Sequence, residues 1–388
     1  MTDRDLFPSS THPPLPPTSE DEQFSRLRLL RSRRVGVTTY KRLLTEHGTA
    51  QNALAALPEV ARAAGVKGYE ICPEAVVQAE LNAARKAGAR LIMHGTAAYP
   101  DALDEISDAP PFLWAVGDPE LLRRPMISLV GARNASSLGL RMATALARDL
   151  GQAGYTIVSG LARGIDTAAH RASLGSGTIA VLAGGVDVIY PQENTELAGD
   201  IATAGLRLSE QPIGMKPVAR HFPARNRIIS GLSRATIVVE AAAKSGSLIT
   251  ARDALDQGRD VLAVPGNPFD ARAAGCNQLI REGATLVRSA QDVTEALSPI
   301  GRQSEEDVTP FSPAPAPEST AKPRDTPLRR VAALHQQILD RLSPSPIAED
   351  QLIRDLAVGT SDAAPVLLEL ELDGRISRQS GGLLVREK

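Results

Sequence analysis

The feature that most constrains the fold is a regular alternation of short apolar runs with amphipathic segments over residues 125–297. Most of the runs are followed by a turn-rich loop and then a helical pattern. The predicted strands are Met126–Val130, Tyr155–Ser159, Thr178–Leu182, Leu206–Ser209, Ala235–Val239, Asp260–Ala263 and Thr285–Val287. Strands that alternate with helices form a mostly parallel, doubly wound sheet. The sequence therefore predicts an α/β domain over 119–297.

Two low-complexity segments separate this domain from its neighbours. Residues 1–22 are polar and proline-rich, which predicts a disordered tail. Residues 298–327 contain SPAPAPEST and predict a proline-rich linker. Two further folded units remain, over 23–118 and over 328–388, so the 388 residues should form three domains.

The first unit, 23–118, is predicted to be helical because apolar residues at helical spacing flank the turn Val35-Gly36-Val37-Thr38. Such a turn could belong to a helix-hairpin-helix unit that contacts DNA backbone. The second glycine of that motif is missing, however. A plain helical adaptor is therefore the preferred interpretation.

The last unit has the order helix, helix, helix, hairpin, which is typical of a winged helix. The predicted elements are Val331–Leu342, Asp350–Leu356, Ser361–Leu372, and the pair Ile376–Ser377 and Leu383–Arg386. The third helix and the residue after it carry four acidic residues, so this helix is unsuited to a DNA groove. We expect this unit to bind protein or to regulate, with its apolar residues Val366, Leu367 and Leu370 in its core, although arginines in the wing leave phosphate contact open.

Composition narrows the setting of the protein. The two cysteines, Cys72 and Cys276, lie far apart without CxxC or Cys/His spacing, so neither a disulfide framework nor a zinc site is predicted. A reducing cytoplasm fits this usage. No apolar run approaches the length of a membrane span, and no signal sequence precedes the first unit. We therefore expect a cytoplasmic protein.

A basic segment marks the candidate site. Between Glu210 and Glu240 the chain has five basic residues and no acid, although the whole protein has a formal charge of −2. These residues are Lys216, Arg220, Arg225, Arg227 and Arg234. Because such a cluster would repel itself without a partner, phosphates are the simplest source of the missing negative charge.

Glycine-rich loops after the predicted strands point to the same ligand. In a doubly wound sheet the ligand sits beyond the carboxyl ends of the strands, where glycine lets the backbone approach a phosphate and serine and arginine donate hydrogen bonds. Together with the basic segment, these loops give the predicted phosphate-binding residues. They are Gly131, Arg133, Ser136, Gly160, Arg163, Gly164, Arg220, Arg225, Asn226, Arg227, Ser245, Gly246 and Ser247.

Familiar nucleotide motifs are absent from the sequence. No GxGxxG follows the first predicted strand and no GxxxxGK[ST] occurs, so neither a dinucleotide nor ATP is implied as a cofactor. Asp166, His170 and Glu240 could serve a hydrolase. We favour a structural reading, with Asp166 at a helix start and His170 hydrogen-bonded nearby. No catalytic residue and no metal ligand is assigned.

The arginines of the basic segment need not share one role. Arg225 and Arg227 lie two apart on a predicted helix and point to different faces, so one could contact phosphate while the other pairs with Glu210 or Glu240. Aromatic residues are only 3% of the chain, which makes backbone phosphates the main source of affinity. Phe222 could stack on a base, although we expect it to lie in the hydrophobic core.

Several motifs in order resemble one family. They are VGARNAS, SGLARGIDTAAH, TIAVLAGGVDVIYPQEN, LSEQP, FPARNRIISGLSRATIVVEAAAKSGSLITA and GRDVLAVPG. This succession is similar to that of the DNA-processing protein A family, also called DprA or Smf, over about residues 127–293. The units before and after it look like the SAM-like and winged-helix-like extensions of some members.

The resemblance implies a Rossmann-like domain in a non-enzymatic protein that binds single-stranded DNA, forms a homodimer through that domain and loads a RecA-type recombinase during transformation. It assigns phosphate contacts to Arg133, Arg225 and Arg227. Gln192 stands where some members have lysine, and the residue before the Phe-Pro pair also varies, so the DNA path could be displaced.

Two other classes stay open on the residues alone. One is a nucleotide-binding enzyme related to nucleotide phosphoribohydrolases, although the stretch AAKSGSLITARD lacks their glutamate at the expected spacing. The other is a sensor of a small phosphate compound. Basic residues spread over several loops favour a groove for a strand over a single enzyme pocket.

Overall fold

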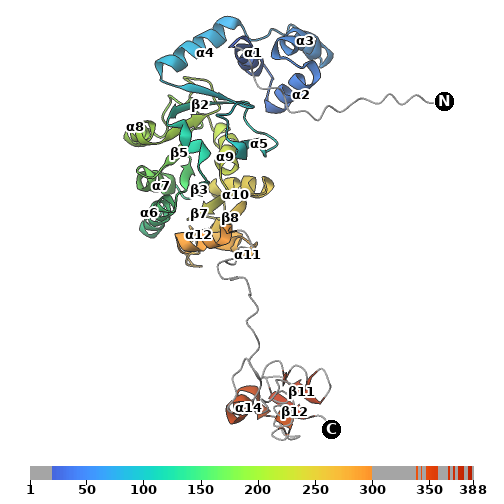
Figure 1. The fold of residues 1–388 in the computed structure, drawn as a ribbon, viewed down its shortest axis with the longest axis vertical. Coiled ribbons are helices and arrows are strands. Elements are labelled where there is room, and N and C mark those ends of the chain that lie inside the picture. The colour runs from blue at the N-terminus through green and yellow to red at the C-terminus, as the bar shows by residue number, and fades with distance from the viewer. Residues whose placement is uncertain are drawn as a thin grey trace, which may run out of the picture. The chain divides into compact units, whose positions relative to one another are not determined.

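The computed structural model describes residues 20–298 without a break and parts of the chain near its C-terminus. These parts are residues 338–339, 342, 347–356, 366–367, 370–371, 375–379 and 383–386. The chain divides into two compact units, 1–303 and 304–388, which are described separately (Figure 1). The predicted tail lies outside the described residues up to residue 19, and the predicted linker does so from residue 299.

Four helices form the N-terminal part of the first unit, as the sequence predicts. They are α1 (Glu20–Arg31), α2 (Val37–His47), α3 (Ala50–Ala63) and α4 (Glu74–Lys86). The hydroxyl of Thr49 caps α3 by accepting a hydrogen bond from the Asn52 backbone N–H at 3.2 Å. Leu27, Leu43 and Val77 are fully buried where these helices meet. A second apolar core therefore exists beside that of the sheet.

Two strands that the sequence reading missed follow these helices. Strand β1 (Arg90–Met93) pairs antiparallel with β2 (Phe112–Gly117), and β2 pairs antiparallel with β6 (Leu206–Ser209). The sheet thus begins inside the range 23–118, for which a helical domain was predicted. Strand β2 is apolar on both faces and lacks the alternation that reveals a half-buried strand.

Both faces of β2 are covered because the strand joins two cores. Phe112 and Trp114 pack with the N-terminal helices, whereas Leu113 and Ala115 pack into the core of the α/β domain. Successive side chains of a strand point to opposite faces, so a single strand can serve both.

The seven predicted parallel strands are all present. Besides β6 they are β3 (Met126–Val130), β4 (Thr156–Ser159), β5 (Thr178–Val181), β7 (Ala235–Val238), β8 (Asp260–Ala263) and β9 (Thr285–Leu286). The order in the nine-stranded sheet is β1-β2-β6-β5-β4-β3-β7-β8-β9. From β3 the chain moves outward to β4, and from β7 it moves the opposite way to β8. The topological switch point therefore lies between β3 and β7.

Helices cover both faces of this sheet (Figure 1). They are α6 (Ser137–Gln152), α7 (Ile165–Ser173), α8 (Thr195–Ala204), α9 (His221–Leu232), α10 (Ser247–Asp256), α11 (Ala274–Arg281) and α12 (Ala290–Leu297), with the short α5 (Asp101–Asp104) beside α9. Ile127 and Leu129 of β3 face the core of α6 and α7, while Met126 and Val130 face the core of α9 and α10. The predicted mostly parallel, doubly wound architecture is confirmed.

The described part of the second unit contains a three-stranded sheet. Strands β10 (Ile347–Ala348), β12 (Leu383–Arg386) and β11 (Ile376–Gln379) pair in that order, and α14 (Glu349–Leu356) follows β10. The predicted hairpin is confirmed, with Ile376 opposite Arg386. Val366, Leu367 and Leu370 are buried in the core of this unit, also as predicted. Most of the predicted helices 331–342 and 361–372 lies outside the described residues.

Within the described ranges, no helix combines the length and the apolar character that a bilayer crossing would need.

A buried polar network fixes the N-terminal helices on β2. The Glu80 carboxylate of α4 accepts a hydrogen bond from the Trp114 indole at 2.9 Å and forms a two-bond ion pair, both bonds 2.8 Å, with Arg31 of α1. The side chains of Glu80 and Arg31 are only 7% and 13% exposed. Removal of the carboxylate would leave a buried guanidinium and a buried indole N–H without this partner.

We predict that Glu80→Ala lowers the free energy of unfolding by about 3 kcal/mol, because breaking a buried ion pair strands a charge. Urea unfolding followed by Trp114 fluorescence measures the loss. Glu74→Ala is the matched control, since Glu74 is 70% exposed in its ion pair with Arg28 and should cost less than about 1 kcal/mol. Equal losses in the two variants would contradict the assignment.

Candidate functional site

An open pocket of about 760 Å³ lies at the switch point of the sheet. Its walls come from the loops that follow β3, β4 and β7, together with the first turns of α9 and α10 and a short part of the loop after β8. This is the place where a doubly wound sheet offers loop backbone and helix N-termini to a ligand.

The structure brings seven of the predicted site residues together in this pocket. They are Gly131, Arg133, Arg225, Asn226, Ser245, Gly246 and Ser247. Gly160 and Arg163 line a small adjoining cavity of about 40 Å³, and Gly164 lines a further pocket between α6 and α7. Arg133 lines all three, so it stands where they meet.

Three predicted residues lie apart from this group. Ser136 is the N-cap of α6, and its hydroxyl accepts a hydrogen bond from the Gly139 N–H at 2.9 Å. Arg220 precedes α9 on an exposed turn and lines none of these three pockets. Arg227 points away from the loops, as the following contacts show.

Arg227 forms ion pairs with two carboxylates that lie outside the pocket. Its guanidinium lies 2.5 Å from Glu210 and 3.2 Å from Asp108, and its side chain is 13% exposed. The expected pairing of one arginine with Glu210 is therefore present. Burial raises the pKa of Glu210, while the charge of Arg227 opposes this shift. A guanidinium engaged in this way is not presented to the pocket.

Arg225 forms the floor of the site. Its Nη1 donates hydrogen bonds to the carbonyl oxygens of Gly160, at 2.7 Å, and Val181. These carbonyls end β4 and β5, so the guanidinium ties α9 to two strands. Burial lowers its pKa to about 10, with Asp166 opposing the shift and Arg133 adding to it. Arg225 consequently stays charged at neutral pH and contributes positive potential from below the pocket.

The glycines serve loop packing as much as ligand access. A Cβ on Gly160 would lie 2.4 Å from Nη1 of Arg225, and one on Gly131 would lie 2.9 Å from the Glu240 carbonyl oxygen. Gly164 has a φ of 76°, and its Cβ would meet the Ala132 carbonyl oxygen at 2.3 Å. These loops cross so closely that only glycine fits.

The three groups that could have served a hydrolase are engaged within the protein. Asp166 is buried and accepts hydrogen bonds from the N–H groups of Gly160 at 3.1 Å and Ala162 at 3.2 Å. Burial raises its pKa and the charge of Arg225 opposes the rise. Glu240 is also buried and accepts hydrogen bonds from the backbone and hydroxyl of Ser136, at 3.0 and 2.5 Å. Both carboxylates hold loops, as the structural reading predicted for Asp166.

His170 is buried as a neutral ring. Its Nε2 accepts a hydrogen bond from the Leu161 N–H at 3.3 Å, and its Nδ1 lies 2.7 Å from the Thr178 hydroxyl. Burial and, to a smaller extent, the charge of Arg225 lower the pKa of His170 to about 3. Protonation would place a second N–H against that of Leu161, so the ring supports the loop after β4 only when neutral.

An aromatic platform borders the pocket. The guanidinium of Arg133 lies over the ring of Phe222, 5.5 Å from its centroid, and the ring of Tyr190 meets Phe222 edge-on at 5.6 Å between centroids. Tyr190 is 52% exposed. Phe222 is half-buried and lines the pocket, so the expectation that it belongs to the core is wrong.

The charged groups that line the pocket are mainly cationic. The lining contains one carboxylate, that of the buried Asp166, and four basic residues, Arg133, Arg225, Lys244 and Arg272. Arg272 forms an exposed ion pair with Asp270 at 2.9 Å, whereas no described carboxylate pairs with Arg133. The N-terminus of α10 adds its partial positive charge through the segment 245–247. The arrangement suits a ligand with several negative charges.

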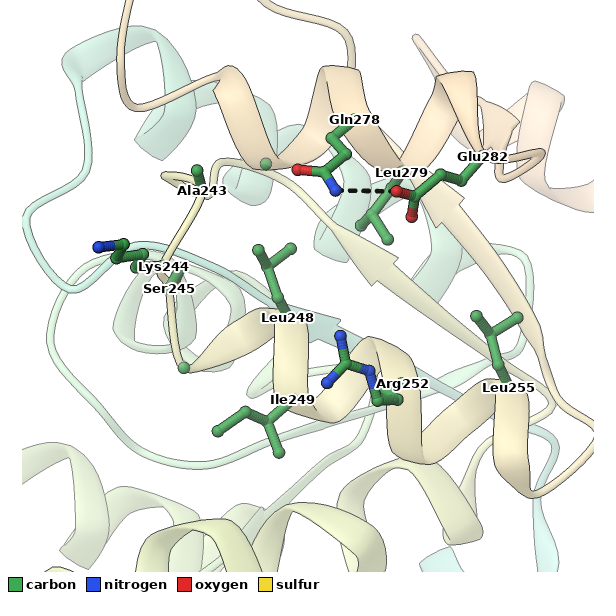
Figure 2. Close-up of a pocket in the computed structure, with 12 residues that line it drawn as sticks. Ala243, Lys244, Ser245, Leu248, Ile249, Arg252, Leu255, Gln278, Leu279 and Glu282 are labelled. Carbon is green, nitrogen blue, oxygen red and sulfur yellow. Dashed lines mark hydrogen bonds between the residues drawn. The ribbon is translucent and has the colours of Figure 1, made fainter.

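The loop 244–246 also borders a second pocket of about 340 Å³ between α10 and α11 (Figure 2). There Leu248 of α10 and Leu279 of α11 point toward one another. Gln278 and Glu282 are joined by a hydrogen bond of 2.8 Å, so one of the charged groups on this side is acidic. The charged residues that line this second pocket are Lys244, Arg252 and Glu282, so it is less strongly cationic than the pocket at the switch point.

Three further residues of the site escaped the sequence reading. Lys244 precedes the serine loop, Arg272 follows β8, and Tyr190 lies beside Gln192 in the motif VIYPQEN. Arg272 and Tyr190 have no basic residue or glycine directly beside them in the sequence. The position of Lys244 directly before Ser245-Gly246-Ser247 was the one available signal. Among the described residues, no group of three or more His, Cys, Asp or Glu side chains could hold a metal ion.

Comparison with known proteins identifies this arrangement. A model of the family described as DNA recombination-mediator protein A matches residues 90–298, more than half of the chain. The chain belongs to this family. The match to the recombination-mediator model begins at residue 90, the first residue of β1.

Models of two accessory domains match the flanking parts. The DprA-like N-terminal HHH domain matches residues 20–83 and the DprA winged helix domain matches residues 312–382. The preference for a plain helical adaptor is therefore corrected. In the turn before α2, Arg34 has a left-handed φ of 64° and Gly36 is the N-cap, so this turn closes without a second glycine.

Relatives in the DNA recombination-mediator protein A family share much of the sequence. The DNA processing protein DprA of Streptococcus pneumoniae is 49% identical over half of this chain and 70% of its own length. Protein Smf of Escherichia coli is 37% identical over 73% of this chain and 74% of its own length.

Two solved structures of such proteins resemble the fold. That of the Streptococcus pneumoniae protein has a TM-score of 0.61 and 38% identity, and covers 70% of this chain and 96% of that one. That of DNA processing protein A from Helicobacter pylori, which was studied for its single-stranded DNA binding mode, has a TM-score of 0.50 and 31% identity. It covers 54% of this chain and 97% of that one.

We predict that His170 makes the protein less stable in acid. Its pKa is about 3 in the fold and near 6.5 when unfolded, so the unfolded state binds the proton first and stability is lost as pH falls below 6.5. At pH 5 the loss attributable to His170 is about 2 kcal/mol. Urea unfolding between pH 7 and pH 5 should show a smaller decline for His170→Gln than for the wild type, and identical slopes would contradict the buried neutral ring.

Proposed function

We propose that the pocket at the switch point binds the phosphate backbone of single-stranded DNA. The observation that carries the proposal is the place of Arg133, which lies over Phe222 where three pockets meet and has no carboxylate partner among the described residues. A strand crossing this junction would meet a cation and an aromatic face at the same point. Both are needed to hold a nucleotide unit by its phosphate and its base.

The surroundings of Arg133 support a strand over a single small phosphate. The pocket of about 760 Å³ continues past Arg133 into a second one of about 630 Å³ between α6 and α7. Cations are spread along it on separate loops, with Lys244 and Arg272 on one side and Arg163 on the other. A ligand with repeated phosphates could use all of them at once.

The aromatic platform supports single strands over duplex DNA. Phe222 and Tyr190 can stack only on a base whose face is accessible, and the bases of a duplex are stacked on one another. The single-stranded DNA binding studied in the Helicobacter pylori relative agrees with this preference. We expect little sequence preference, because stacking and phosphate contacts do not read base edges.

We also propose that the protein has no enzymatic activity of its own. The carboxylates of Asp166 and Glu240 are each satisfied by backbone or hydroxyl donors, and His170 is buried and neutral. A nucleotide hydrolase would need at least one of them at the ligand with a free oxygen or nitrogen. Among the described residues that line this pocket, the one carboxylate is that of Asp166, which two backbone N–H groups already engage, and this disfavours the hydrolase alternative.

The partners proposed for this activity follow from the family. A mediator of recombination has to transfer its DNA to the enzyme that pairs strands, so we propose that the protein loads a RecA-type recombinase. We further propose that it acts in the cytoplasm as a homodimer through the α/β domain. The two buried free cysteines, Cys72 and Cys276, suit a reducing compartment.

We predict that Arg133→Ala weakens binding of single-stranded DNA about tenfold, because a charge-assisted contact to phosphate is lost. The plot of log affinity against log salt should flatten by about 0.7, the value for one phosphate contact on a single strand. Fluorescence anisotropy with labelled single-stranded and double-stranded oligonucleotides at several salt concentrations measures both.

The matched control for this variant is Arg148→Ala, on α6 and outside the pocket. Arg148 is 57% exposed and pairs with Asp149 at 2.7 Å. It should keep the affinity and the salt dependence of the wild type. Failure of the wild type to bind at low salt would refute the DNA proposal, and hydrolysis of nucleoside monophosphates would then be the next assay.

A second variant separates stacking from charge. Phe222→Leu keeps an apolar side chain but removes the aromatic face, so we predict a loss of about fivefold or more in affinity for single strands. The salt dependence should stay unchanged, since no phosphate contact is removed. A flattened salt plot in Phe222→Leu would mean that the ring only positions Arg133.

A further inference from the structure

A second cationic pocket lies at the opposite end of the strands. It has a volume of about 540 Å³ and is bounded by the segments 97–102, 122–126 and 232–234. The last two segments lead directly into β3 and β7, so this pocket lies at the amino ends of the strands whose carboxyl ends border the DNA pocket. With a strand of five residues between them, the two sites are roughly 15 Å apart.

Three arginines and one carboxylate line this pocket. Arg123, Arg124 and Arg234 are all exposed, and the acid is Asp101. Arg234 belongs to the basic segment that the sequence singled out, yet it directly precedes β7 and lines none of the pockets at the other end of the strands. The DNA pocket therefore leaves Arg234 without a role.

The ion pairing of these arginines is sparse. Arg123 approaches Glu120 at 3.3 Å in a pair whose two side chains are 67% and 65% exposed, which is a weak surface interaction. Arg124 donates to the Ser176 carbonyl oxygen at 3.0 Å, which fixes its direction without neutralising it. Among the described residues, no carboxylate pairs with Arg124 or Arg234.

Four exposed arginines elsewhere in the described chain are neutralised by a neighbouring acid. Arg148, Arg163, Arg272 and Arg288 each have an ion-pair partner within 3.0 Å. Three arginines border one hollow whose lining contains a single acid, so an anion there would be attracted by all three. The planar guanidinium fork matches phosphate oxygens in particular.

We propose that this pocket, formed by Arg123, Arg124 and Arg234 at the amino ends of β3 and β7, is a second phosphate-binding site. Its ligand carries several phosphate charges. That chemistry has two sources, the backbone of a longer DNA strand and a free nucleoside triphosphate. The site is independent of the DNA pocket, because no residue is shared between the two.

Binding of inorganic tripolyphosphate by calorimetry tests the site directly. The full-length protein is first saturated with a short oligothymidylate, which fills the pocket at the switch point. Tripolyphosphate is then titrated. We expect wild type to bind it and the double variant R123A/R234A to bind it at least tenfold more weakly. Arg42→Ala, which removes an exposed arginine from α2, is the matched control and should bind like wild type.

A variant that removes a negative charge from the pocket tests whether weaker binding in R123A/R234A is caused only by misfolding. Asp101→Asn removes the one acid that lines the pocket, so tripolyphosphate should bind severalfold more tightly. A structural role for these residues would not produce a gain. Unchanged tripolyphosphate binding in R123A/R234A, or its absence from the wild type, would overturn the proposal.

Two further titrations distinguish the sources of phosphate. If the site serves DNA, R123A/R234A should flatten the salt dependence for a long oligothymidylate but not for a short one. If it serves a nucleotide, both oligonucleotides should bind as in wild type while binding of a nucleoside triphosphate is lost. Loss of short-oligonucleotide binding in R123A/R234A would instead mean that the two pockets are not separate.

Discussion

The site depends on the buried guanidinium of Arg225. Its hydrogen bonds to the carbonyl oxygens of Gly160 and Val181 join α9 to the carboxyl ends of β4 and β5, and its charge is balanced by Asp166, which holds the loop between them. A buried charge is tolerated only when its hydrogen bonds are made, so these contacts are obligatory. They place Phe222, one helical turn earlier, under Arg133. The positions of the exposed residues of the site therefore depend on the buried guanidinium of Arg225.

The parallel strands could be predicted from the sequence because each is a short apolar run between turn residues. Strands β1 and β2 could not, since β2 is apolar on both faces and lies after four helices. The basic segment showed that an anion site exists but not which arginines face it. Arg225 and Arg227 differ because Glu210 and Asp108 come from distant parts of the chain. Lys244 and Arg272 reach the pocket only through the fold.

The glycine loops illustrate a different limit of sequence reasoning. A glycine after a strand is compatible with a close ligand or with a close neighbour in the protein. At Gly131, Gly160 and Gly164 the neighbour is protein, namely another loop or the Arg225 side chain, whereas a Cβ on Gly246 would meet nothing within 4 Å. Only the last of these glycines leaves its space open. Crowding therefore explains why the loops are rich in glycine, and the cations among them support the proposed binding of anions.

Glu240 determines what the first helix of the parallel sheet can accept as a ligand. In dinucleotide-binding sheets the first helix after the first strand of the parallel sheet receives the pyrophosphate at its N-terminus. Here that helix is α6, and the Glu240 carboxylate already occupies its first turn through Ser136, with Gly139 left side-chain-free beside it. The protein carries a permanent internal substitute for the nucleotide phosphate. The first turn of α6 is thus satisfied within the protein, and the proposed DNA ligand meets the outer loops instead of this helix N-terminus.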